Sequence, residues 1–136
     1  MRDKNTAIIP IAIRFNDIDL MGHVNNAVYL SYFEEARMSF FNRILGKDHD
    51  WEKQGIILVK NVIEYKQPLR LKHEVEVMVW CDGPRSKSFT MNYEIRERGN
   101  ESNVFSTGHS VVVCFDYQIQ RSIEIPADWH RIFKNQ

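Results

Sequence analysis

Two carboxylates two residues apart, Asp17 and Asp19, have the type and spacing most suited to chemistry in this sequence. They lie in the polar stretch NDIDLMGHVNN, between a strand-like segment and a helix-like segment. The start of a helix presents unpaired backbone N–H groups and the positive end of the helix dipole, which can stabilise an oxyanion while a nearby carboxylate attacks a carbonyl or activates water. The stretch therefore favours acyl transfer.

The residues of this stretch have different predicted roles. Asp19 is the candidate catalytic residue, because Gly22 and the helix start follow it directly. Asp17 lies nearer the strand and is expected to orient the turn through an Asx-type hydrogen bond. His23 is a binding candidate, since a histidine beside a helix start is more often held by local hydrogen bonds than used for proton transfer. The residues expected to bind the oxyanion and the substrate are Gly22, His23, Val24, Asn25 and Asn26, with the backbone N–H groups of Val24 through Asn26 as the free donors.

Two other chemistries fit these carboxylates less well. Asp17, Asp19 and Gly22 match positions 1, 3 and 6 of an EF-hand calcium loop, but Val28 stands at position 12, where a bidentate Glu is needed. An aspartyl phosphotransferase would need Mg²⁺ ligands and an alternating βαβ pattern, and no such pattern follows. No cluster of His, Cys, Asp and Glu offers metal-ligand spacing elsewhere, so no metal is predicted.

The composition sets the class of protein. The 136 residues carry 18 Lys plus Arg and 18 Asp plus Glu, and a formal net charge of zero provides no field that would attract nucleic acid or an anionic membrane. No stretch approaches the ~20 apolar residues of a membrane span, and the N-terminus has no secretory signal. Cys81 and Cys114 lie outside any CxxC motif and are expected to be reduced, buried thiols. We expect one cytoplasmic domain over residues 1–136, with neither nucleic-acid nor membrane partners.

Hydrophobic periodicity predicts the elements that position these residues. Alternation over residues 8–15 predicts a strand that buries Ile9, Ile11, Ile13 and Phe15 on one face. The next segment has apolar side chains at three- and four-residue steps, which predicts one long helix. The apolar residues of that helix, expected in the core, include Tyr29, Tyr32, Phe33 and Phe40; Asn25 or Asn26 is expected to cap it and Gly46 to end it.

The remainder of the chain is predicted to form mainly strands. Alternation predicts them at Ile56–Tyr65, Glu74–Cys81, Ser88–Arg96 and about Val104–Tyr117, and Pro126 can open a short helix through Phe133. The apolar stripe of one helix and the apolar face of one sheet each need the other. The fold class is therefore α+β, with one long central helix wrapped by a curved, five-stranded antiparallel sheet.

The residues around the helix start also point to a family. The run Asp17-x-Asp19-x-x-Gly22-His23-Val24-Asn25-Asn26-x-x-Tyr29-x-x-Tyr32-x-Glu34-x-Ala36-Arg37 resembles the 4-hydroxybenzoyl-CoA thioesterase branch of the hotdog-fold acyl-CoA thioesterases. Two later segments, Gln67-Pro68-Leu69 and Arg85-Ser-Lys-Ser-Phe89, are similar to later parts of that family. The resemblance covers nearly the whole chain.

The resemblance implies a hotdog fold and hydrolysis of acyl-CoA thioesters to free acid and CoA, with no metal or organic cofactor. It places the catalytic carboxylate on Asp19, acting as nucleophile or as general base, and the carbonyl-polarising N–H near Asn26. It also implies homodimers or homotetramers (dimers of dimers) with sites between subunits. Arg85 and Lys87 are candidates for contacts with the CoA phosphates, although basic residues in turns are commonly only solvated.

Two alternatives stay open, and a third is disfavoured by a missing motif. Acyl carrier protein shares the pantetheine arm of CoA, so a carrier-protein thioesterase would carry the same residues. A non-catalytic hotdog protein that binds acyl thioesters would keep the pocket without turnover, an interpretation that the presence of Asp19 disfavours. Hotdog dehydratases need a His poised for proton removal in a glycine- and proline-rich motif, which this chain lacks.

The resemblance does not extend to the acyl group of the substrate. The His23-Val-Asn25-Asn26 segment differs from the hydroxybenzoyl-specific members of the family, so an aromatic substrate is not implied for this chain.

Overall fold

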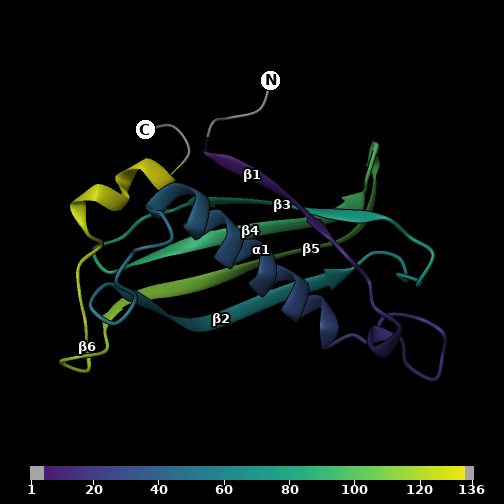
Figure 1. The fold of residues 1–136 in the computed structure, drawn as a ribbon, viewed down its shortest axis with the longest axis horizontal. Helices are drawn as coiled ribbons and strands as arrows, with labels where there is room; N and C mark the ends of the chain where they lie inside the picture. Colours follow the sequence, from purple (N-terminus) through teal and green to yellow (C-terminus); the bar gives the residue numbers. More distant parts are fainter. Residues whose placement is uncertain (1–4, 134–136) are drawn as a thin grey trace.

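The computed structural model describes residues 5–133, and they form one antiparallel sheet with a helix lying across one face (Figure 1). The strands are β1 (Thr6–Ile11), β2 (Gly55–Tyr65), β3 (Val75–Asp82), β4 (Ser88–Glu97), β5 (Asn100–Asp116) and β6 (Arg121–Ser122). The helix α1 spans Val28–Leu45, and two 3₁₀ turns, η1 (Phe15–Asp17) and η2 (Ala127–Ile132), complete the elements. The strand order is β1-β3-β4-β5-β2, with the two-residue β6 paired to β5. The predicted α+β hotdog architecture is confirmed, with β6 as a short sixth strand beside the five expected ones.

Helix α1 supplies one side of the core. Seven of its residues are buried: Tyr29, Tyr32, Phe33, Ala36, Arg37, Phe40 and Phe41. The apolar members of this set recur at helical spacing and face the sheet, as predicted. The helix ends where expected, because Gly46 adopts φ 89° and its N–H donates to the Asn42 carbonyl at 3.0 Å.

The start of α1 differs from the prediction. The N-cap residue is Ala27, and no side chain caps the helix. Asn25 instead closes the turn just before it: its side-chain oxygen accepts the Ala27 N–H at 3.0 Å, and its carbonyl accepts the Val28 N–H at 2.9 Å. The prediction of Asn25 or Asn26 as the N-cap was therefore wrong in position, because the asparagine bends the chain one step before the first helical turn.

The first strand is shorter than the alternation predicted. β1 pairs with β3 from Thr6↔Trp80 to Ile11↔Val75 and stops there. Phe15, expected in the core, begins a 3₁₀ turn and is 80% exposed. The alternation continues past Ile11 in the sequence, but β3 offers no further partner beyond Val75 in this register. The chain leaves the sheet and turns towards the start of α1.

A glycine in the longest strand lets the helix approach the sheet. A Cβ on Gly108 of β5 would lie 2.7 Å from the Phe33 ring and 2.7 Å from the Val62 carbonyl oxygen. Phe33 uses this space to stack on Tyr93 of β4, with ring centroids 4.4 Å apart and planes 7° from parallel. Gly108 thus allows the first half of α1 to pack tightly on the sheet.

The two cysteines have the environment that the sequence predicted. Cys81 and Cys114 are free and buried, as expected, and burial raises the pKa of both thiols, that of Cys114 to about 12. Within residues 5–133, the structure has no helix with the length and apolar character needed to cross a membrane.

Candidate active site

The chain between η1 and α1 forms a small hairpin that carries most of the predicted site residues. Ile18 and Val24 pair as an isolated antiparallel bridge, and the Asp19 N–H donates to the His23 carbonyl at 2.9 Å. The turn closes with the Gly22 N–H on the Asp19 carbonyl at 3.0 Å, and Gly22 adopts φ 83°. A side chain at position 22 would be strained by this backbone conformation, which explains the glycine.

Asp19 has a carboxylate that remains available. Its Oδ1 accepts the Met21 N–H at 3.0 Å, which is an Asx-type contact inside the turn. The side chain is half-buried, and among the described residues it makes no ion pair. Asp19 is thus oriented by one backbone group while most of its hydrogen-bonding capacity is unused.

Asp17 lies in a different environment two residues earlier. It is buried, and its Oδ2 accepts hydrogen bonds from the Tyr32 hydroxyl at 2.7 Å and the Arg14 N–H at 2.9 Å. Burial acts to raise the pKa of this carboxyl, but the hydrogen bonds from Arg14 and Tyr32 and the Arg14 charge outweigh it, so the pKa lies below its ordinary value. These contacts agree with the predicted orienting role, although the Arg14 N–H and Tyr32 replace the simple Asx turn that was expected.

Only one of the three expected oxyanion donors is free. The Val24 N–H donates to the Leu69 carbonyl at 2.8 Å, and the Asn25 N–H donates to the Asp17 carbonyl at 2.9 Å. The expectation of three free donors was therefore wrong for Val24 and Asn25, because the distant Leu69 carbonyl occupies the first N–H and the nearby Asp17 carbonyl occupies the second. The N–H of the exposed Asn26 has no hydrogen-bond partner among the described residues, so it is available to a ligand or to water.

A cleft of about 280 Å³ opens beside this free N–H. Its lining residues come from the hairpin, the start of α1, the end of β2 and the loop after it: His23, Val24, Asn26, Tyr29, Tyr65, Lys66, Gln67 and Pro68. Asp19 does not line the cleft. Its backbone N–H, however, donates to the carbonyl of His23, which is a lining residue. The hairpin thus links Asp19, through its backbone, to a residue of the cleft wall, and Asn26, whose N–H has no partner among the described residues, belongs to the same wall.

Sequence reasoning missed the far wall of this cleft. The Tyr65 hydroxyl donates to the Asn26 carbonyl at 2.9 Å, and the Tyr65 ring meets the Tyr29 ring edge-on with centroids 4.8 Å apart. The Tyr29 hydroxyl in turn accepts the Leu69 N–H at 3.2 Å. Only the Gln67-Pro68-Leu69 similarity pointed to this loop, because nothing local to residue 65 indicates a neighbour 39 positions earlier.

A larger groove of about 410 Å³ lies farther along α1, against the first half of β2. Arg37 lines it, and its guanidinium donates to the Tyr93 hydroxyl at 2.9 Å and lies 3.7 Å from the exposed Glu34 carboxylate. Arg37 is buried although its side chain is charged. Because none of the predicted site residues lines this groove, the smaller cleft at the helix start is the better candidate for the reaction site.

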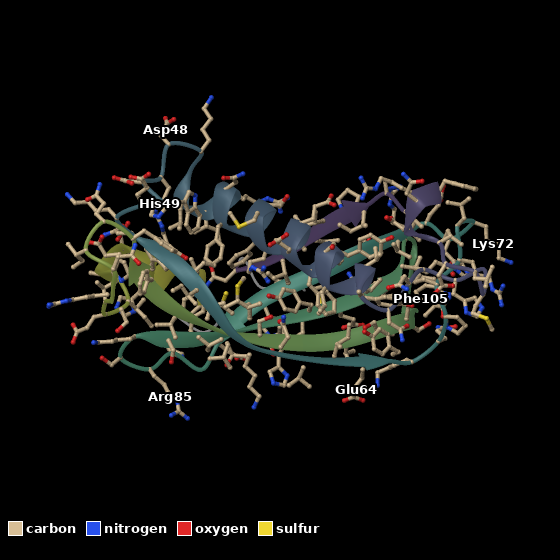
Figure 2. The ribbon with its side chains drawn as sticks, turned by 90° about the horizontal axis from the view of Figure 1, so that it is seen from below. Asp48, His49, Glu64, Lys72, Arg85 and Phe105 are labelled. Carbon is tan, nitrogen blue, oxygen red and sulfur yellow. The ribbon has the colours of Figure 1, made fainter. Side chains whose placement is uncertain are left out.

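The two candidate CoA contacts lie far from this cleft. Figure 2 shows Arg85 at one end of the molecule and Lys72 and Phe105 at the other. The loop that contains Lys72 follows Leu69, which contacts Val24 in the cleft wall. Arg85 and Lys87 are both exposed in the turn between β3 and β4, so a single chain does not bring them together with Asp19.

The described part of the chain offers no candidate metal centre. Over residues 5–133, no group of three or more His, Cys, Asp or Glu side chains is arranged to hold a metal ion.

Comparison with known proteins gives one family match. The family model described as the thioesterase-like superfamily matches residues 13–133, which include the hairpin, α1 and every strand from β2 onwards.

Individual relatives are similar over most of their length. "Putative acyl-CoA thioesterase YneP" of Bacillus subtilis is 26% identical over 129 residues, covering 91% of this chain and 92% of the relative. A solved structure described as a putative acyl-CoA thioesterase from Xanthomonas campestris is 34% identical with a TM-score of 0.74, covering 81% of this chain and 92% of the other. A thioesterase from Thermus thermophilus, solved with coenzyme A and Zn, is 30% identical with a TM-score of 0.76 and covers 91% and 94% of the two chains.

Proposed function

Because the chain belongs to the thioesterase-like superfamily, we propose that it hydrolyses acyl-CoA thioesters to a free acid and CoA. The observation that carries this proposal is the free Asn26 N–H in a cleft beside the Asp19 hairpin. The names of two relatives, which specify acyl-CoA, and the CoA bound to a third support CoA as the carrier.

The reaction needs one carboxylate and one oxyanion donor. The thioester carbonyl oxygen accepts the Asn26 N–H, which stabilises the negative charge that develops on it. Asp19 then acts in one of two ways. As a nucleophile, its carboxylate attacks the carbonyl carbon, the CoA thiolate leaves, and water hydrolyses the resulting anhydride. As a general base, Asp19 takes a proton from the water that attacks the same carbon, and the thiolate leaves with a proton.

The CoA part of the substrate is best accommodated by two copies of the chain. Of the two edge strands, β2 has eleven residues and exposes Leu58, Val59, Val62 and Tyr65, whereas β1 is shorter and contains Pro10. Two copies of β2 pairing antiparallel would bring the Tyr65 end of one chain next to the Gly55 end of the other.

The strand register connects this arrangement to the basic turn. Gly55 pairs with Phe115, and Val113 two residues earlier pairs with Ser88, which follows Lys87. The basic turn thus lies towards the Gly55 end of β2. In the two-copy arrangement, Arg85 and Lys87 of one chain approach the Tyr65 cleft of the other, where they can contact CoA phosphates.

Release of free thiol from a panel of acyl-CoA substrates tests the proposal. We expect turnover with at least one acyl-CoA and, in matched assays, slower turnover when the same acyl group is carried by acyl carrier protein. Faster hydrolysis of the carrier-protein substrate would support the carrier-protein thioesterase. Tight binding of acyl-CoA with no thiol release would support a non-catalytic binding protein.

A further inference from the structure

We propose that Asp17 and Tyr32 form a clamp that sets the relative positions of Asp19 and the Asn26 N–H, so that both are positioning residues for the reaction. This inference rests on the proposed function and adds two side chains that do not line the cleft.

The contacts of Asp17 are those of a structural anchor. Its side chain is only 4% exposed, and its nearest charged partner, the Arg14 guanidinium at 3.5 Å, belongs to a side chain that is 78% exposed. Such an exposed pair contributes little. The short bond from Tyr32 and the bond from the Arg14 N–H are the contacts that compensate for burying the carboxylate.

Asp17 connects both arms of the hairpin to the helix. Its side chain binds Tyr32, which lies in the second turn of α1. Its carbonyl accepts the Asn25 N–H at 2.9 Å, which fixes the arm that leads to Asn26. Two residues after Asp17, Asp19 begins the other arm. The clamp therefore holds the carboxylate and the oxyanion donor against the same helix turn.

Loss of the clamp is expected to affect the chemical step. Without the bond between Asp17 and Tyr32, the hairpin would keep the hydrogen bonds that close its turn and pair its two arms. Its distance from α1 would no longer be fixed. A displacement of about 1 Å between reacting groups can cost up to ~10²-fold in rate. Since neither Asp17 nor Tyr32 lines the cleft, binding of the substrate should change much less than turnover.

The kinetic test uses Tyr32→Phe, which removes only the hydroxyl. We expect kcat to fall about tenfold and KM to stay within about twofold, at a temperature where the variant is fully folded. The matched control is Tyr117→Phe, which removes a comparable bond, from the Tyr117 hydroxyl to the Ile56 carbonyl at 2.7 Å, outside the hairpin. The control should retain wild-type kcat, and a Tyr32→Phe enzyme with wild-type kcat would overturn the clamp.

A conservative change separates positioning from chemistry at Asp17. Asp17→Asn retains an oxygen that can accept from both Tyr32 and the Arg14 N–H, whereas Asp17→Ala retains none. The clamp predicts that Asn restores most of the kcat lost with Ala, and that both variants bind free CoA like the wild type. If Asn were as inactive as Ala, the charge of Asp17 would itself take part in the reaction, and the positioning role would be wrong.

Hydrogen exchange tests the clamp without any activity. In Tyr32→Phe, the Asn25 amide should exchange at least about tenfold faster than in the wild type, while Tyr117→Phe leaves it unchanged. Unchanged exchange at Asn25 would contradict the clamp even if the enzyme proved to be a thioesterase. A wild-type protein that hydrolyses no thioester would reject the proposed function, and the exchange rate would still decide whether Tyr32 holds the hairpin.

Discussion

Two aspartates of the hairpin show how environment divides roles between identical side chains. Asp17 is buried and its hydrogen-bonding capacity is largely used, whereas Asp19 is half-buried and engages one backbone N–H. A group that attacks a carbonyl or takes a proton needs free lone pairs, and Asp19 has more of them than Asp17. The division follows from the fold, since the sequence shows only two carboxylates two residues apart.

The environment of Asp17 predicts how stability depends on pH. Its pKa in the folded state lies below the ordinary value of 3.8, so its ionised form stabilises the protein above pH 3.8 and this contribution is lost as pH falls through the folded-state pKa. Asp17→Asn has no such contribution. Denaturant unfolding should show the wild type more stable than Asp17→Asn at pH 6, with the difference shrinking below pH 3.8. A difference that grows towards acid would mean that the pKa of Asp17 is raised instead.

The site could be predicted from sequence to the extent that it is local. Asp19, Gly22 and the helix start lie within ten residues, and their types and order were enough to propose acyl transfer. The pairing of Val24 with Leu69, by contrast, depends on a loop 45 positions away, and it removes a donor that local reasoning counted as free. Tyr65 was missed for the same reason, because tertiary contacts have no local signature.

At the scale of elements, hydrophobic periodicity located the helix and the strands β1, β3, β4 and β5, which bury one face, and an apolar run located the largely exposed edge strand β2. The prediction failed where pairing partners end, as at Phe15, and where one residue shifts the start of a helix, as at Ala27. The burial of Arg37 has no local signal either, because it depends on the Tyr93 hydroxyl of β4, 56 positions later. The end of a strand, the exact start of a helix and the burial of a charged side chain depend on tertiary contacts, which the periodic pattern does not contain.

Close packing of α1 on the sheet gives an element-scale prediction. Gly108→Ala places a methyl group 2.7 Å from both the Phe33 ring and the rigid Val62 carbonyl oxygen, so the helix or the edge strand has to move. We expect the free energy of unfolding to fall by about 1–3 kcal/mol. Thr107→Ala, at the half-buried neighbouring position, is the control and should cost less. Equal stabilities for Gly108→Ala and wild type would show that the contact between α1 and β5 is looser than described.

At the scale of the whole molecule, the sheet has an exposed edge at β2, and the candidate site residues lie in two separate places, around Asp19 and around Arg85. β2 pairs with β5 on one side only among the described strands, and an edge strand that exposes apolar residues invites pairing with another chain. The position of Arg85 at the far end from the cleft agrees with a site that two copies complete.

Disruption of the β2 edge should therefore remove assembly and activity together. Val59 is 56% exposed on β2, and Val59→Glu is expected to reduce both the mass measured by light scattering and the rate of thioester hydrolysis. Ile119→Glu changes a 59% exposed aliphatic residue that lies outside the strands and should alter neither. A fully active monomer at assay concentration would show that each chain builds its own complete site.

Metal removal is a second test of the whole molecule. In the part of the chain that the structure describes, no three potential ligands gather near Asp19 or elsewhere. We expect turnover to survive exhaustive treatment with EDTA. Because the Thermus thermophilus relative was solved with Zn, the assay should include re-addition of Zn²⁺. Activity that disappears with EDTA and returns with one divalent ion would contradict the metal-free reaction.

The most direct test of the account is kcat of Asp19→Asn at saturating acyl-CoA, measured beside Asp17→Asn. An amide of the same shape can neither attack the thioester carbonyl nor take a proton from water, so kcat of Asp19→Asn should fall by ~10²-fold or more while the fold is kept. Asp17→Asn, which preserves the clamp, should lose much less. Wild-type turnover in Asp19→Asn, together with loss of turnover in Asp17→Asn, would show that the buried aspartate and not the half-buried one performs the chemistry.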